Sequence, residues 1–189
     1  RQGALTPQEG GRLLTFCNNA GPAFAVGVAG GTVFSSGRIG VYLYLIHVTA
    51  ALSAGLLLCR RGSSSAAAPP PAPVRTGLAQ RFLSAVTDAA AAMGRVCAFV
   101  VFFLVLLRLA ETATGPWSAP AAGFMELTNG ILRLTPDRRG FVTAAALLGW
   151  GGLSVHCQTA AVTAGSGIPM GRYLPAKAVQ AALSAGLAW

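Results

Sequence analysis

The stretch Ile39–Leu58, IGVYLYLIHVTAALSAGLLL, contains no residue that carries a formal charge at neutral pH. A run of about 20 apolar residues is the length that an α-helix needs to cross the hydrocarbon core of a bilayer. Arg60 and Arg61 follow one residue later, and basic residues at the end of such a run are typical of a membrane boundary. We therefore predict a transmembrane helix here and an all-α integral membrane protein in a cell membrane, with the lipid bilayer as its first partner.

The composition of the whole chain agrees with a membrane protein. Of its 189 residues, 53% are hydrophobic and only 10% are charged, whereas about 25% are charged in an ordinary globular domain. The net charge is +9, but the arginines stand at the edges of apolar runs without the interleaved aromatic residues on which nucleic-acid bases stack. The sequence therefore argues against nucleic acid as a partner.

A low-complexity segment, GSSSAAAPPPAPVRTG at Gly62–Gly77, separates two apolar regions. Proline-rich segments of this kind form extended spacers and do not pack a core. We expect three parts: residues 1–58, a linker with a lead-in helix at 59–84, and residues 85–189, whose transmembrane helix covers about 89–109. The arginines near the linker predict that it faces the cytoplasm.

Two shorter apolar regions are interrupted by polar or glycine residues. A helix capped by Thr6 is expected to end near Asn18, before Gly21-Pro22, because proline lacks the amide donor of a helix interior. An apolar piece at 23–34 follows, with small residues four apart that predict a helix-contact face at Ala23, Gly27 and Gly31. A short helix is expected at 124–134. Residues 141–150 are apolar until Gly151-Gly152, and a last helix starts near Tyr173.

Short apolar legs around a polar interruption are typical of re-entrant hairpins and broken helices in transporters. Backbone groups freed at such a break can bind a solute, and the N-terminus of a half-helix favours an anion. An intramembrane acid such as Glu126 could couple to H+ or Na+. We expect substrate-binding residues among Asn18, Asn19, Gly21, Glu126, Thr128, Asn129, Gly151, Gly152, Ser154, His156 and Gln158. The alternative is that these polar groups only join helices to one another.

The sequence gives little support to catalysis. It contains no nucleophile-elbow motif, no phosphate-binding loop and no histidine or cysteine pair at a metal-ligand spacing. We therefore expect neither an enzyme nor a bound cofactor or metal. His47, inside the Ile39–Leu58 run, is interpreted as an interior histidine facing another helix, with a titrating group in a transport path as the alternative.

Three blocks of sequence resemble a known family. RQGALTPQEGGRLLTFCNNAGPAF (1–24), GFMELTNG (123–130) and GWGGLSVHCQ (149–158) are similar to the YlbJ family of sporulation integral membrane proteins, which has two nucleoside-recognition (Gate) domains. The resemblance implies an inverted-repeat fold like that of the concentrative nucleoside transporters. Residues 1–58 would end the first Gate repeat and residues 85–189 would form most of the second. It also implies that the chain is a fragment, with a further membrane region upstream. The family often has Thr or Ser where this chain has Cys17 and Ala20.

The resemblance also implies a function. The YlbJ family is associated with moving dipicolinic acid, a small aromatic dicarboxylate, across the outer membrane around the developing spore. The expected partner is therefore a small anionic or nucleoside-like solute. A non-transporting membrane scaffold for spore-envelope assembly and a nucleoside transporter of the same fold remain as alternatives, and oligomeric state, coupling ion and transport direction stay open.

Overall fold

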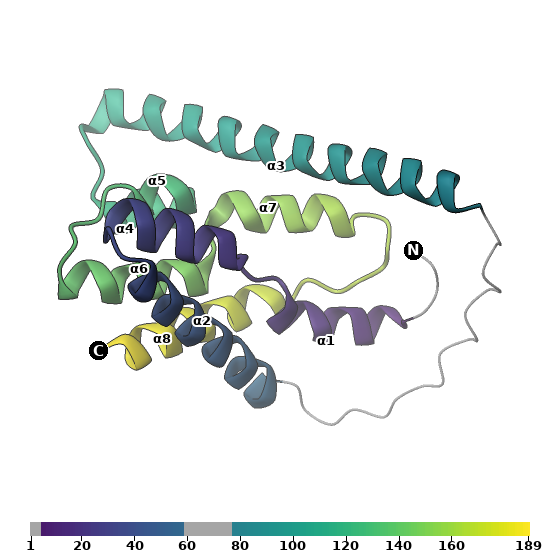
Figure 1. Ribbon diagram of the computed structural model, residues 1–189, viewed down its shortest axis with the longest axis horizontal. Helices are drawn as coiled ribbons and strands as arrows, with labels where there is room; N and C mark the ends of the chain where they lie inside the picture. The colour runs from purple at the N-terminus through teal and green to yellow at the C-terminus, as the bar shows by residue number, and fades with distance from the viewer. Residues whose placement is uncertain (1–4, 59–76) are drawn as a thin grey trace.

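The computed structural model describes residues 5–58 and 77–189, and this part of the chain is helical and contains no β-strand. Most of the predicted linker, with Arg60, Arg61 and Arg75, lies outside the described residues. The helices are α1 (Pro7–Cys17), the π-helix η1 (Ala23–Val33), α2 (Gly37–Leu58), α3 (Leu78–Thr114), α4 (Ala119–Met125), α5 (Leu127–Ile131), α6 (Arg138–Trp150), α7 (Gly152–Thr163) and α8 (Tyr173–Ala188). Figure 1 shows α3 lying along one side of the other helices.

Three helical segments are long and apolar enough to cross a membrane: Gly37–Leu58, Leu78–Thr114 and Arg138–Thr163, the last made of α6 and α7. Their exposed positions carry large apolar side chains, for example Leu56, which is 83% exposed, and Phe102, which is 56% exposed. An exposed apolar surface of this kind suggests contact with lipid. The predicted lead-in helix and second span form the single helix α3, so this helix is longer than the expected 89–109.

The first predicted break is present. Thr6 caps α1 in a reciprocal capping box with Glu9, and the helix ends at Cys17. The chain is then non-helical through Gly21 before η1 begins. The helix is therefore interrupted at residues 18–21, directly before Pro22, where the break was expected.

The contact face predicted on the 23–34 piece is wrong. Nothing lies within 4 Å of a Cβ placed at Gly27, whereas a Cβ at Gly30 would be 2.5 Å from the Cα of Gly40 on α2. The reason is the π-helical turn, in which the N–H of Phe34 donates to the carbonyl of Ala29, five residues back. A π-helical turn contains more residues than an α-helical turn, so residues four apart do not stay on one face of the helix.

Helix α8 lies at the centre of the packing, against α6 and α2. Helices α6 and α8 approach closely at Gly149 on α6, where a Cβ would lie 2.7 Å from the Cα of Ala181. Buried apolar residues of η1, α2, α5 and α6 form the core beside it, including Ala25, Leu43, Ile131 and Leu148.

The predicted helix at 124–134 is two short helices, α4 and α5, with an extended residue between them. Glu126 has φ −142° and ψ 119° and caps the start of α5. The second predicted break, at Gly151-Gly152, is present: both glycines have positive φ, +91° and +83°. Left-handed backbone favours glycine, which explains why the helix stops and restarts there.

Candidate functional site

The first break meets α7 and the start of α8 through one side chain. The amide Nδ2 of Asn18 donates to the hydroxyl of Thr159 at 2.8 Å and to the hydroxyl of Tyr173 at 2.6 Å. Thr159 follows Gln158 on α7, and Tyr173 opens α8. Thr159 and Tyr173 are thereby joined to the break, although they lie 141 and 155 positions from Asn18 in the chain.

Lys177, on α8, is the second centre of the site. Its ammonium Nζ donates to the backbone carbonyl of Asn18 at 3.0 Å and to Oε1 of Gln180 at 2.7 Å. The residue is only 2% exposed. It is the only lysine in the sequence. Both acceptors are neutral, so the ammonium has hydrogen-bond partners but no opposite charge.

The sequence has five acidic residues, and all of them lie in the described part of the chain. Glu9, Glu126 and Asp137 cap helices, and Glu111 pairs with Arg133 and Arg108. The fifth, Asp88, is exposed on α3. None of the five forms an ion pair with Lys177 among the described residues. A buried charge without a counter-charge is costly, and this is the main electrostatic feature of the site.

The side chain of Lys177 also reaches the second break. A Cβ placed at Gly151 would lie 4.0 Å from Cε of Lys177. The lysine stem therefore runs beside the left-handed turn between α6 and α7, while its ammonium lies on Asn18 at the first break. The two interruptions are brought together around this residue.

A further chain of hydrogen bonds ties the first break to α2. Nε2 of Gln180 donates to Oδ1 of Asn19 at 3.0 Å and lies 3.4 Å from Nδ1 of His47. The other ring nitrogen of His47 accepts the backbone N–H of Ala20 at 3.2 Å. His47 is fully buried, and its ring contacts the first break and α8.

Aromatic rings line one side of the network. The ring of His156 lies edge-on to Trp150 at 4.5 Å and to Tyr173 at 5.3 Å between centroids, and Trp150 stacks on Phe124 at 5.0 Å. Nδ1 of His156 is 3.0 Å from the hydroxyl of Tyr173. Its Nε2 is buried and has no hydrogen-bond partner in the described part of the chain. Buried polar atoms usually have a partner, so the unpartnered nitrogen is an unusual feature of this network.

An open pocket of about 230 Å³ adjoins the network between α1 and α7. Asn18 and Gln158, one residue from each predicted half of the site, both line it, and so does Thr159. The remaining lining residues are Leu14, Val162 and Thr163. Small-molecule sites combine apolar and polar side chains, and this pocket offers two apolar and four polar lining residues.

The predicted residues around Glu126 form a separate cluster. Its carboxylate accepts the N–H of Thr128 at 3.0 Å, the N–H of Asn129 at 2.8 Å and the side-chain amide of Asn129 at 2.7 Å. Gly152 packs against it, since a Cβ there would lie 3.4 Å from Cα of Glu126. Glu126 therefore caps α5, and it is not among the residues that line the Asn18 pocket.

Of the other predicted residues, Ser154 is buried in α7 and Gly21 is exposed at the first break. Sequence reasoning missed four residues of the network, namely Thr159, Tyr173, Lys177 and Gln180. The sequence did contain a signal for the lysine. It is the one formal charge in the mostly apolar segment Tyr173–Ala188, and a charged residue in such a helix is a reason to suspect function.

Comparison with models of known protein families, with curated proteins and with solved structures finds no match.

Proposed function

We propose that the chain is part of a membrane transporter for a small anionic solute, bound where the two helix breaks meet. The observation that carries this proposal is Lys177, a buried cation with neutral acceptors. A carboxylate that entered from the Asn18 pocket would supply the missing opposite charge. Asn18 links the pocket to the lysine, because the residue lines the pocket and its backbone carbonyl accepts a hydrogen bond from the ammonium.

An aromatic acid fits the rest of the site. The edge-on and stacked rings of Phe124, Trp150, His156 and Tyr173 form an aromatic wall, and aromatic pairs prefer such geometries over face-to-face contact at the same distance. The unpartnered Nε2 of His156 offers one further polar contact. The resemblance to the YlbJ family makes dipicolinate the first solute to test, and the outer forespore membrane the expected location.

The proposed architecture is an inverted-repeat transporter in which α1–η1 and α6–α7 are the broken helices. Broken helices are tolerated in a bilayer where protein or a cavity satisfies the freed backbone groups. The Lys177–Asn18 contact supports this reading, because it satisfies a carbonyl at one break while the lysine stem lies beside the other. Coupling to H+ or Na+ belongs to the same proposal.

The test is uptake into proteoliposomes that contain the purified protein. Labelled dipicolinate and labelled uridine are compared, for the wild type, for Lys177→Met and for Arg95→Gln. Methionine keeps much of the lysine stem and removes the charge, whereas Arg95 is an exposed cation on α3 that serves as the matched control. We expect dipicolinate uptake by wild type and R95Q, and a loss of at least tenfold in K177M.

The alternatives give different results. Uptake of uridine without dipicolinate would identify a nucleoside transporter, and no uptake of either solute by a folded protein would favour the scaffold. A K177M variant that keeps full dipicolinate uptake would reject the role assigned to the lysine. Circular dichroism of each reconstituted variant separates loss of function from loss of helical structure.

A further inference from the structure

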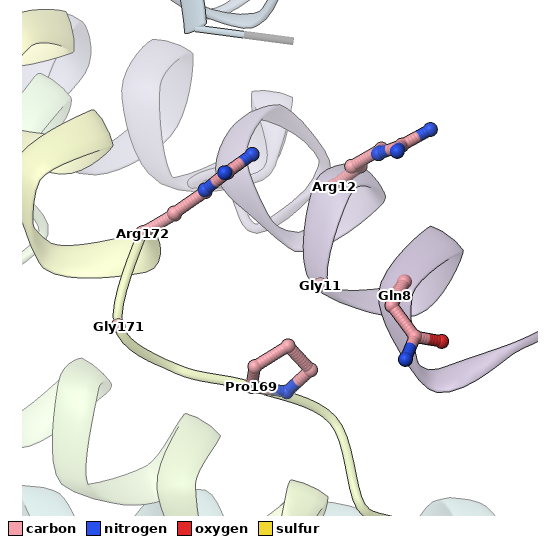
Figure 2. Close-up of a pocket in the computed structure, with 6 residues that line it drawn as sticks. All are labelled: Gln8, Gly11, Arg12, Pro169, Gly171 and Arg172. Atoms are coloured by element: carbon pink, nitrogen blue, oxygen red, sulfur yellow. The ribbon is translucent and has the colours of Figure 1, made fainter. Parts of the chain in front are cut away.

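A second pocket, of about 280 Å³, lies between α1 and the loop that leads into α8. Gln8, Gly11 and Arg12 line it from α1, and Pro169, Gly171 and Arg172 line it from the loop (Figure 2). Gly11 fixes how closely the two segments approach, because a Cβ there would lie 3.0 Å from Cγ of Pro169. The pocket is thus built by packing between segments far apart in the chain.

The pocket is positively charged. Arg12 and Arg172 are its two charged residues, and no acidic residue is among those that line it. In Figure 2 both arginine side chains extend to the same side, away from Pro169. Because both residues line one pocket, their guanidinium groups are suited to a phosphate, which arginine can bind through paired N–H donors.

An apolar pocket of about 250 Å³ adjoins the charged one. Gly171 and Arg172 line both pockets, and the second is completed by Leu57, Leu58 and Pro175. Leu57 is 67% exposed. A basic recess and an apolar surface therefore meet at Arg172, which is the arrangement that a molecule with an anionic head and an apolar tail requires.

The position along α2 decides between a lipid and a water-soluble anion. Leu58 is the last residue of α2, one of the segments long and apolar enough to cross a membrane. The two pockets consequently lie at the level where α2 leaves the bilayer, which is the level of the lipid headgroups. We propose that Arg12 and Arg172 bind the phosphate of an anionic phospholipid whose acyl chain lies along Leu57 and Pro175.

This site is independent of the proposed solute site. None of its lining residues contacts Lys177 through a hydrogen bond in the described part of the chain, and lipid binding is measured without any transport assay. The sequence places Arg60 and Arg61 just after Leu58. If the basic linker faces the cytoplasm, the bound lipid belongs to the leaflet that is rich in anionic headgroups.

The experiment is native mass spectrometry of the purified protein in detergent, titrated with phosphatidylglycerol, phosphatidylcholine or inorganic phosphate. The variants are Arg172→Gln, Arg12→Gln with Arg172→Gln, and Arg38→Gln. Arg38 is the matched control, because it is an exposed arginine at the opposite end of α2. We expect phosphatidylglycerol to bind more tightly than phosphatidylcholine, about fivefold weaker binding in R172Q and a larger loss in the double variant. R38Q should bind like the wild type.

Three results would overturn the proposal. Equal losses in R38Q and R172Q would show binding to general positive charge. Inorganic phosphate that displaces the lipid at similar concentrations would show a site for free anions. Equal binding of phosphatidylglycerol and phosphatidylcholine would show that the negative charge of the headgroup is not recognised. Leu57→Asn separates the two halves of the site, since it should weaken phosphatidylglycerol and leave phosphate unchanged.

Discussion

The ammonium of Lys177 donates to the backbone carbonyl of Asn18 at 3.0 Å, across 159 positions of sequence. This contact joins α8 to the chain between α1 and η1, at a point where the helical hydrogen bonds are interrupted. The only lysine of the chain is thus used to satisfy a broken helix, at the cost of burying a cation.

Lys177 should react slowly with an amine-specific reagent, because it is 2% exposed and both of its hydrogen bonds must break. A dicarboxylate such as dipicolinate should slow the reaction further by pairing with the ammonium. The measurement is the modified fraction of the peptide that contains residue 177, followed by mass spectrometry. Benzoate is the control for a single carboxylate. Acceleration by dipicolinate would contradict an anion site at Lys177.

Gly30→Ala should destabilise the protein strongly, and Gly27→Ala should not. A Cβ at Gly30 would be 2.5 Å from the Cα of Gly40, so η1 and α2 would have to separate, whereas Gly27 has nothing within 4 Å. Overpacking against backbone costs about 3 kcal/mol. Thermal unfolding in detergent measures both variants. A G30A protein as stable as G27A would mean that the two helices are not in this contact.

These glycines also illustrate the limit of reading the sequence. The break at Gly21-Pro22 was predictable, because proline removes a local hydrogen bond whatever the surroundings. The contact face of η1 was not, because its register depends on the π-helical turn, shown by the bond from Phe34 to Ala29. A pattern assumed to follow the α-helical period then assigns the wrong residues to the interface.

The candidate site divides in the same way. Asn18, Asn19 and Gln158 were predictable, since polar residues at a break in an apolar region need a reason to be there. Thr159 and Gln180 were not, because each is an ordinary helical residue whose role comes only from packing against a distant segment. Glu126 was predicted to take part in solute binding because it is charged. Its three hydrogen bonds at the start of α5 depend on the extended backbone of Glu126 itself, which the sequence pattern does not indicate.

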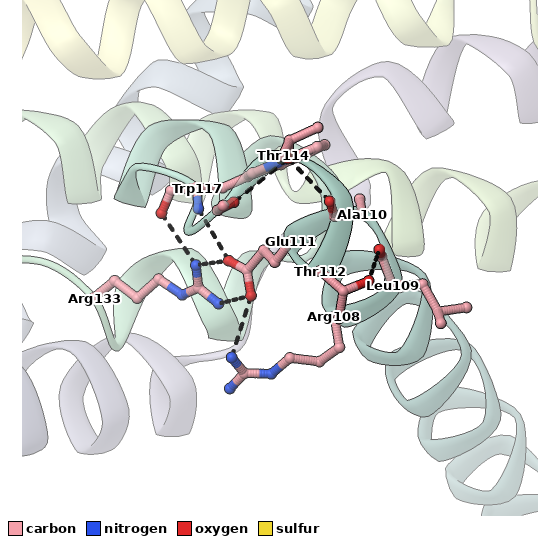
Figure 3. A network of polar contacts seen from close by, with 9 residues as sticks. Arg108, Leu109, Ala110, Glu111, Thr112, Thr114, Trp117 and Arg133 are labelled. Carbon is pink, nitrogen blue, oxygen red and sulfur yellow. Dashed lines mark hydrogen bonds and ion pairs between the residues drawn. The ribbon is translucent and has the colours of Figure 1, made fainter.

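Arg133→Gln should loosen the C-terminal end of α3, and Arg108→Gln should have little effect. Glu111 of α3 pairs with Arg133, whose guanidinium also donates to the carbonyl of Trp117 at 3.1 Å (Figure 3). Arg108 makes one contact at 3.2 Å and is 66% exposed, so solvent screens it. Hydrogen exchange over residues 108–117 should rise in R133Q alone. Equal exchange in both variants would mean that the ion pair does not hold α3.

Asp137 should make stability depend on pH at the start of α6. The N–H of Gly140 and the hydroxyl of Thr135 donate to its carboxylate and hold the pKa of Asp137 below its ordinary value. A lowered folded-state pKa means that the stabilisation is complete above the unfolded pKa of about 3.9 and is lost as the pH falls through the folded value. Asp137→Asn keeps a capping oxygen and cannot ionise. Its melting temperature should approach that of the wild type as the pH falls below about 4; a constant difference would refute the prediction.

Glu126→Gln should weaken the fold before it affects any coupling step. The carboxylate accepts three hydrogen bonds through both oxygens, so a glutamine must turn its NH2 group toward at least one N–H donor. Loss of such a cap costs about 1–2 kcal/mol. Asn129→Ala, which removes only the side-chain donor, is the matched control and should cost less. The measurements are thermal unfolding and dipicolinate uptake, both at a temperature where all variants stay folded. A capping role predicts that E126Q melts below N129A and still takes up dipicolinate at that temperature. A stable E126Q protein without uptake would instead support the prediction that Glu126 couples to H+ or Na+.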